Sequence, residues 1–484
     1  MKRARSSAPS SKKNDANPPE NLTMEQFERM DAKFKKVPIN QVIQNAISAN
    51  SINEVCQNRN YLQGYDRTFS NVIEPELDTT DQMQSGRCWI FAVLNVARHK
   101  MVCQYELEND FEFSQCYLSF WDKLEKCNYF LNEIIRNRHL DNFLNDKYIE
   151  CLLHDPISDG GQWVTCKNLI KKYGLVPRTV FDESFNSSNT MGMNYILEYK
   201  LRQFAKELYG LRSKADSECY RRKDEMMDTV YHIMCKLFGS PKLPNSPFDW
   251  SYCIDQEKDM AALIERQVKR RKTDKYENLE LKKKMTTNAI DYYRDYVPFD
   301  CDSLIQLNHD PRNPYYKCYT SDKPNTVYGG ERVCYLNVPI EKLIEATHKS
   351  ILDNTPVIFM CDISKHVNMY EGLLDNKCFN YESIFNTSFE KMDKASRLSF
   401  RESNANHAMT IVGVDLDQSG GPIKWEVENS WGQITGNFIM TTDWFRDYVF
   451  EIVVDEKYLD VETMRLYQRE KSNPVVFPFD DPMV

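Results

Sequence analysis

The sequence of 484 residues lacks the features of a membrane or secreted protein. No window approaches the ~18 uninterrupted apolar residues that a membrane-spanning helix needs. The start, MKRARSSAPSSKKNDANPPE, has no apolar core and does not resemble a secretory signal. Basic residues are not in excess either, since 62 Lys and Arg stand against 71 Asp and Glu, for a formal net charge of −9. This balance argues against a general nucleic-acid binder, and we expect no membrane partner.

Metal-binding spacing is also missing. The 15 cysteines are scattered, with no CxxC pair and no Cys/His cluster at zinc spacing. An odd number of cysteines without a signal peptide is typical of a reducing compartment with free thiols. The sequence therefore predicts a cytoplasmic protein without a metal site.

What the chain does contain changes along its length. Residues 1–22 are basic and Ser/Pro-rich, which predicts a disordered tail. Helical patterns follow, with Thr23 as a helix N-cap, a buried central helix over 89–102 and further helices through 191–237. Strand patterns come last, at TPVIFMCDI, HAMTIVGVD, IKWEVENSW, NFIMTTDWF and YVFEIVVD. Helices first and strands last indicate an α+β enzyme with its site between the two parts.

One stretch, QMQSGRCWIFAVLNVARHK, suggests a nucleophile. Ser85-Gly86 can form a turn that leaves Cys88 in the first turn of the apolar helix. A helix N-terminus lowers the pKa of a cysteine, and the thiolate is the reactive form. A cysteine before an apolar helix is by itself more often structural, so a base is needed.

Two later motifs supply that base and a group to orient it. His407 opens an apolar strand, and Asn429 lies at a strand end in ENSWG. An Asn amide oxygen can orient an imidazole, and the neighbouring Trp431 can shield that hydrogen bond from water. Cys88, His407 and Asn429 together form the nucleophile, base and orienting group of a thiol hydrolase.

These motifs resemble the papain-like cysteine peptidases, in particular the branch of bleomycin hydrolase and aminopeptidase C. The resemblance covers nearly the whole chain after about residue 25 and rests on QSGRCWIFA, DGGQWVTCKNLIKKYGLVP, DPRNPY, VIFMCDISKH, NHAMTIVGV, WEVENSWG and FPFDDPMV. Ser85 stands where papain-like enzymes usually carry a disulfide cysteine. Cys88 and His407 are 319 residues apart, against roughly 130 to 150 in papain, so about 170 to 190 residues are inserted.

The resemblance implies an α+β fold with a papain-like core of two subdomains, a helical left part and a β-barrel-like right part, plus a large helical insertion. The expected divisions are a disordered basic tail (1–22), an N-terminal arm and helical subdomain with Cys88 (23–190), a mainly helical insertion for oligomerisation (191–300), a β-rich subdomain with His407 and Asn429 (301–474), and a C-terminal tail directed to the active-site cleft (475–484).

The resemblance also implies a cytosolic cysteine aminopeptidase that removes N-terminal residues from peptides through a thioester, without a cofactor. Gln82 matches the oxyanion-hole glutamine and joins Cys88, His407 and Asn429 in the expected catalytic set. Gly160-Gly161 matches the segment whose backbone pairs with an extended substrate. Trp431 and Val484 complete the expected substrate-binding residues. Enzymes of this branch form homohexamers, so a homohexamer is expected.

Two departures and two alternatives remain. The chain ends at Val484 about three residues earlier than the family usually does, or about 10 Å at roughly 3.3 Å per residue, which predicts leakier exopeptidase action. The charged block around 257–287 looks longer than usual, and is expected as a solvated helix or loop. One alternative main role is hydrolysis of small amides or thiolactones. The other alternative is a nucleic-acid-binding side role through the basic tail or the block over 266–284.

Overall fold

The computed structural model describes residues 21–253, 282–321, 325–389, 391–432, 436–478 and 481–483. It forms two compact units, one of Met1–Arg59 with Phe379–Phe389 and one of Asn60–Cys378 with Glu390–Val484. None of the described helices is long and apolar enough to cross a bilayer. Residues 1–20 of the predicted basic tail and residues 257–281 of the charged block, the segments of the predicted nucleic-acid-binding side role, lie outside the described residues.

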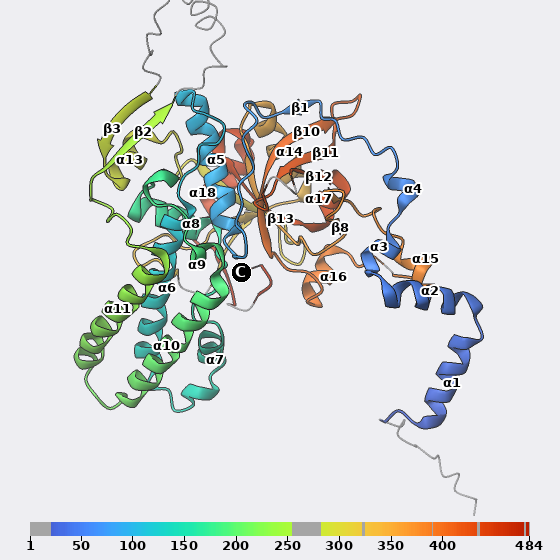
Figure 1. Cartoon of the computed structure of the whole chain (residues 1–484), viewed down its shortest axis with the longest axis horizontal. Helices are drawn as coiled ribbons and strands as arrows, with labels where there is room; N and C mark the ends of the chain where they lie inside the picture. The colour runs from blue at the N-terminus through green and yellow to red at the C-terminus, as the bar shows by residue number, and fades with distance from the viewer. Residues whose placement is uncertain are drawn as a thin grey trace, which may run out of the picture. The chain divides into compact units, whose positions relative to one another are not determined.

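The helices (Figure 1) have these bounds: α1 Met24–Lys35, α2 Pro38–Ala49, α3 Ile52–Cys56, α4 Arg59–Leu62, α5 Cys88–Tyr105, α6 Gln115–Asn137, α7 Lys147–His154, α8 Trp163–Tyr173, α9 Phe185–Ser188, α10 Thr190–Gly210, α11 Asp216–Phe238, α13 Ala289–Tyr296, α14 Ile340–Leu352, α15 Tyr381–Phe385, α16 Lys394–Ser399, α17 Thr442–Tyr448 and α18 Val461–Glu470. The predicted cap of α1 is confirmed: Thr23 and Gln26 form a reciprocal capping box.

The strands are β1 Asn71–Val72, β2 Phe248–Cys253, β3 Lys282–Thr287, β4 Leu304–Asn308, β5 Lys317–Ser321, β6 Tyr335–Asn337, β7 Val357–Cys361, β8 Val367–Asn368, β9 Leu373–Leu374, β10 His407–Leu416, β11 Pro422–Glu428, β12 Phe438–Thr441, β13 Val449–Asp455 and β14 Val475–Phe477. Within the described residues, twelve of them form one sheet in the order β14-β5-β6-β4-β13-β7-β10-β11-β12-β9-β8, with β1 paired to β10, and β2 pairs with β3.

Helix α5 lies against the central strands of this sheet, as Figure 1 shows. It is buried nearly all round, which confirms the central helix predicted from its unbroken apolar sequence. Successive strand residues face opposite sides of the sheet, so Ile358 and Ala408 join the core around α5 while Phe359 and Met409 join the core under α14. The α+β prediction is confirmed.

Two local predictions need correction. Only Phe438–Thr441 of NFIMTTDWF is a strand; the Thr441 side chain accepts a hydrogen bond from the Trp444 N–H at 3.2 Å and caps helix α17. A Thr at this position favours a helix start over continued strand pairing. The end of the charged block, Lys282–Thr287, forms strand β3 in antiparallel register with β2, rather than a helix or loop.

Candidate active site

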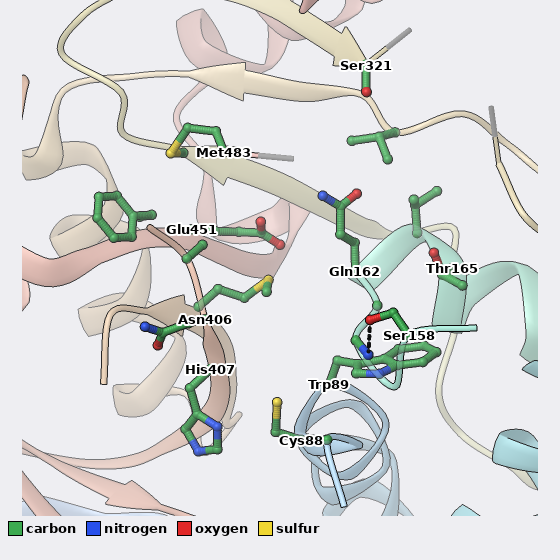
Figure 2. Close-up of a pocket in the computed structure, with 18 of the residues that line it drawn as sticks. Cys88, Trp89, Ser158, Gln162, Thr165, Ser321, Asn406, His407, Glu451 and Met483 are labelled. Atoms are coloured by element: carbon green, nitrogen blue, oxygen red, sulfur yellow. Dashed lines mark hydrogen bonds between the residues drawn. The ribbon is translucent and has the colours of Figure 1, made fainter. Parts of the chain in front are cut away.

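A cavity of about 600 Å³ lies between the start of α5 and the central strands (Figure 2). The predicted site residues that line it are Gln82, Cys88, Gly160, Gly161, His407 and Trp431. Asn429 is completely buried next to His407. The structure thus brings together every predicted site residue except Val484, which lies outside the described residues.

Cys88 is the first residue of α5, as the turn at Ser85-Gly86 predicted. Burial raises the pKa of the Cys88 thiol. The backbone N–H groups of Ala408 and Trp89 act in the opposite direction, because they hydrogen-bond the sulfur. Ala408 follows His407 directly, so this contact holds the sulfur next to the imidazole, as Figure 2 shows.

His407 opens β10 and is held by Asn429. Its Nε2 lies 2.9 Å from the Asn429 Oδ1. An amide oxygen only accepts hydrogen bonds, so Nε2–H is the donor and Nδ1 is left as the basic nitrogen. Burial lowers the pKa of His407, and the bond to Asn429 acts to raise it. The ring of Trp431 lies 5.0 Å from the imidazole, where it shields this bond from water.

Gln82 is tied to the segment that follows Asn429. Its backbone N–H donates to the Ser430 carbonyl at 2.8 Å, and the Ser430 hydroxyl donates to the Gln82 Oε1 at 2.7 Å. The side-chain Nε2 donates to the Ser85 carbonyl at 2.5 Å. An amide nitrogen carries two hydrogens, so the second remains for a ligand in front of Cys88.

The Gly160-Gly161 segment lies on the wall of the cavity next to Trp89. A Cβ on Gly161 would lie 2.5 Å from the Trp89 ring, so no side chain fits there. Within the described part of the chain, the backbone N–H and C=O of Gly161 form no hydrogen bond. An extended peptide is therefore able to pair with this backbone.

A charged network that the sequence did not indicate supports this wall. The Lys126 ammonium donates to the carbonyls of Ser158 and Gly160 at 2.7 and 2.8 Å. Asp159 pairs with Lys123 at 2.6 Å and accepts the Gly86 N–H at 3.3 Å. The acidic residue directly before Gly160-Gly161 was the available signal.

The C-terminal tail reaches the same cavity. Phe477 of β14 stacks on Tyr319 with the ring centroids 4.9 Å apart. Asp481 then accepts a hydrogen bond from Arg312 at 2.8 Å, and Met483, which is 5% exposed, forms part of the cavity lining. Arg312 belongs to the DPRNPY motif, whose role could not be read from the sequence.

Glu451 also lines the cavity and was not predicted. It lies in β13 opposite Asn308 of β4 and is 5% exposed. Burial raises the pKa of its carboxyl group to about 8, although hydrogen bonds from Gln306 and Asn308 act to lower it. The signal in the sequence was an acidic residue inside the apolar run VFEIVVD.

Comparison with known proteins shows which family the chain resembles. The model of the Peptidase C1-like family matches residues 21–484. Bleomycin hydrolase of Rattus norvegicus is 34% identical over 474 residues, 96% of this chain and 98% of the relative. Aminopeptidase C of Lactobacillus delbrueckii subsp. lactis is 33% identical over 472 residues, with the same two coverages of 96% and 98%.

A solved structure supports the same conclusion. The crystal structure of PepW from Lactobacillus rhamnosis HN001 matches with a TM-score of 0.84 and 31% identity over 96% of this chain and 99% of that chain. The fold is therefore that of a papain-like cysteine peptidase. The chain belongs to the Peptidase C1-like family, among relatives named bleomycin hydrolase and aminopeptidase C, and the predicted resemblance is confirmed.

Proposed function

We propose that the protein is a cysteine aminopeptidase that removes N-terminal residues from peptides. The observation that carries the proposal is one cavity lined by Cys88 at a helix start and by His407 hydrogen-bonded to Asn429. The names of its relatives, bleomycin hydrolase and aminopeptidase C, support the same activity.

In the proposed mechanism, His407 takes the Cys88 proton on Nδ1. Burial disfavours both charged forms, since it raises the pKa of Cys88 and lowers that of His407. The backbone donors to the sulfur and the Asn429 amide oxygen oppose this effect and stabilise the thiolate–imidazolium pair. The thiolate then attacks the scissile carbonyl, and His407 protonates the leaving amine. Water activated by His407 hydrolyses the thioester.

Gln82 and the Cys88 backbone N–H are the proposed donors to the oxyanion. The bond from Ser430 fixes the orientation of the Gln82 amide, so that Nε2 is on the side of Ser85 and the cavity. Each such donor stabilises the transition state by roughly 3 kcal/mol. We expect Gln82→Ala to lower kcat about 100-fold, with a smaller change in KM.

The position of the C-terminal tail supports the proposal that the enzyme requires a free N-terminal amine. Met483 lines the cavity and Asp481 is anchored to Arg312, so the tail occupies space that a longer substrate would need. Release of N-terminal residues should therefore be compared between free and N-acetylated peptides of graded length by timed mass spectrometry. Equal cleavage of both series would contradict aminopeptidase action.

The nucleophile is tested by Cys88→Ala, which should abolish turnover without unfolding the protein. Iodoacetamide should label Cys88 before the other thiols and inactivate the enzyme at the same rate. Cys151→Ala is the matched control, because Cys151 is an exposed thiol that has no part in the proposed mechanism. Full activity of Cys88→Ala would overturn the mechanism.

His407 and Asn429 should differ in effect because only the first transfers protons. His407→Ala should leave almost no activity, while Asn429→Ala should leave a measurable fraction, since the imidazole remains but is no longer oriented. Equal and total loss in both variants, with both proteins folded by circular dichroism, would count against this division.

We also propose a homo-oligomer, most simply the homohexamer that the resemblance implies. Helices α1 and α2 contain no buried residue although they carry Phe27, Phe34 and Val42. On α10, Tyr195 and Tyr199 stack on each other while both are exposed. Exposed apolar side chains in such groups are typical of interfaces.

Light scattering tests this assembly. A mass near the 57.0 kDa of one chain at micromolar concentration would overturn it. If α10 lies in the interface, Tyr195→Glu should lower the mass of the assembly, whereas Lys206→Glu, at an exposed position of the same helix, serves as the control.

For the compartment, we propose the cytosol. The 14 cysteines whose side chains the structure describes are free thiols, which supports a reducing environment. Fractionation of cells that produce the protein would test this, and recovery from an oxidising compartment would contradict it.

A further inference from the structure

We propose that Glu451 binds an ammonium group of the substrate, either the α-ammonium of its first residue or the ε-ammonium of a lysine side chain. The proposal rests on the proposed peptidase function and adds a specificity-determining residue to it. Glu451 projects from β13 into the same cavity as Cys88 and His407, and Figure 2 shows its carboxyl group directed across that cavity toward Gln162.

Strand register explains why the side chain points there. Glu451 pairs with Asn308 of β4 on one side and with Met360 of β7 on the other. Asn308 and Met360 also line the cavity, so Glu451 lies on a row of side chains that face the substrate space. A structural carboxylate would instead face a partner within the protein.

One oxygen of this carboxyl group has no partner among the described residues. Gln306 and Asn308 hydrogen-bond the group, but Oε1 is buried and makes no hydrogen bond within the part of the chain that the structure describes. No ion pair in that part of the chain involves Glu451 either. The cavity-lining Lys126 is engaged with Asp122 and two backbone carbonyls.

Burying a charged carboxylate is unfavourable when one of its oxygens has no hydrogen-bond donor. Burial outweighs the bonds from Gln306 and Asn308 and raises the pKa of Glu451 to about 8, so the empty cavity favours the neutral carboxyl group. A cation that enters the cavity would favour the carboxylate, complete its hydrogen bonding and remove this cost. An ammonium ion fits, because it carries one positive charge and three donors.

The test measures the affinity of peptides for the Cys88→Ala variant, which should bind substrate without hydrolysing it. Calorimetry would compare three tripeptide amides: norleucyl-alanyl-alanine with a free α-amine, its N-acetyl form, and N-acetyl-lysyl-alanyl-alanine. We expect one of the two ammonium-bearing peptides to bind at least 10-fold more tightly than the N-acetylnorleucyl peptide. Adding Glu451→Gln should remove that difference.

The peptide that binds more weakly after Glu451→Gln identifies the source of the ammonium. The norleucyl peptide with a free amine carries only the α-ammonium, and the N-acetyl-lysyl peptide carries only the ε-ammonium. Thr165→Val is the matched control, because it removes a neutral polar group from the same cavity. We expect it to change all three affinities by a similar small factor. If Glu451→Gln does the same, or if no ammonium-bearing peptide is preferred, the proposal is overturned.

Turnover measured separately keeps the two proposals apart. Ammonium preference in Cys88→Ala with no hydrolysis by the unmodified enzyme would defeat the proposed function and leave the role of Glu451 as a binding group. Hydrolysis of free peptides with no loss of preference in Glu451→Gln would leave the proposed function and defeat the role of Glu451.

Discussion

Asp159 and Glu451 are both largely buried carboxyl groups beside the active-site cavity, and the protein treats them in opposite ways. Asp159 accepts hydrogen bonds from Thr190 and Asn194 at 2.5 and 2.9 Å and pairs with Lys123. Burial acts to raise its pKa, but Lys123 and these bonds outweigh burial and hold the pKa below its usual range. No cation among the described residues acts on Glu451, and its pKa is raised to about 8.

The difference separates a structural acid from one left for a ligand. The bonds of Asp159 join α6, α10 and the turn before Cys88, so its charge holds the framework of the site together. Glu451 lines the cavity, and its Oε1 makes no hydrogen bond to the described residues, so this oxygen holds no other element in place. Removing the first charge should therefore cost stability, and removing the second should cost recognition.

The largest effect is expected from Asp159→Ala. This change leaves the Lys123 ammonium, whose side chain is 1% exposed, buried without its carboxylate. Loss of one partner of a buried ion pair costs about 3 to 5 kcal/mol. Urea denaturation followed by circular dichroism should show this loss.

The double variant Asp159→Ala with Lys123→Met supplies the control, because it removes both charges. It should lose less stability than Asp159→Ala alone. If Asp159→Ala lowers the free energy of unfolding by less than about 1 kcal/mol, the Asp159 network does not stabilise the framework of the site. The contrast drawn between Asp159 and Glu451 would then be wrong.

A pH-dependent effect of opposite sign, at most comparable in size at pH 8, is expected from Glu451→Gln. With a folded pKa of about 8 against an ordinary value of 4.5, Glu451 contributes stability below pH 4.5 that is lost as the pH rises toward 8. The loss is about 1.4 kcal/mol per pH unit in this range. The Gln side chain does not titrate, so the Glu451→Gln variant should become progressively more stable than the unmodified protein from pH 5 to pH 8.

Denaturation at pH 5, 6, 7 and 8 in both proteins measures this difference, and all other titrating groups cancel in it. A difference that stays constant with pH would mean that Glu451 ionises normally. The argument for an unmet carboxylate in the cavity would then be lost, while the Asp159 prediction would stand.

The sequence could predict the parts of this site that depend on neighbours along the chain. Cys88 at a helix start, His407 at a strand start and the Thr23 cap follow from local patterns, and the structure has all three. The α+β class followed from the order of helical and strand patterns. Thr441 shows the limit of this reasoning, since a cap inside a strand-like run started a helix.

The remaining features depend on which elements meet in space. Asp159 meets Lys123 because the loop of residues 157–160 is hydrogen-bonded to lysines of α6. Glu451 faces the cavity because β13 pairs it with Asn308 of β4 and, after a register shift that follows Val449, with Met360 of β7. A shift of one residue in that register would turn Glu451 to the other face of the sheet. No pattern within a single segment determines these pairings.

The smallest effect on stability is expected from Asp481→Ala. Asp481 is a third carboxylate, 13% exposed, paired with Arg312 and hydrogen-bonded to the Met483 N–H at 2.9 Å. Arg312 keeps a second partner in Asp310, so the cost should be at most about 1 kcal/mol.

The functional effect of Asp481→Ala should be larger than its effect on stability, because this residue anchors the end of the tail beside the cavity. With the anchor removed, Met483 should leave the wall part of the time and open room for substrate. Cleavage of N-acetylated peptides should then rise several-fold, while cleavage of free N-termini changes little. Timed mass spectrometry measures both, and Asp443→Ala, at an exposed position in α17, controls for the lost charge. If N-acetylated peptides stay whole in Asp481→Ala, the tail does not limit access, and Glu451 would remain as the proposed basis for selecting a free amine.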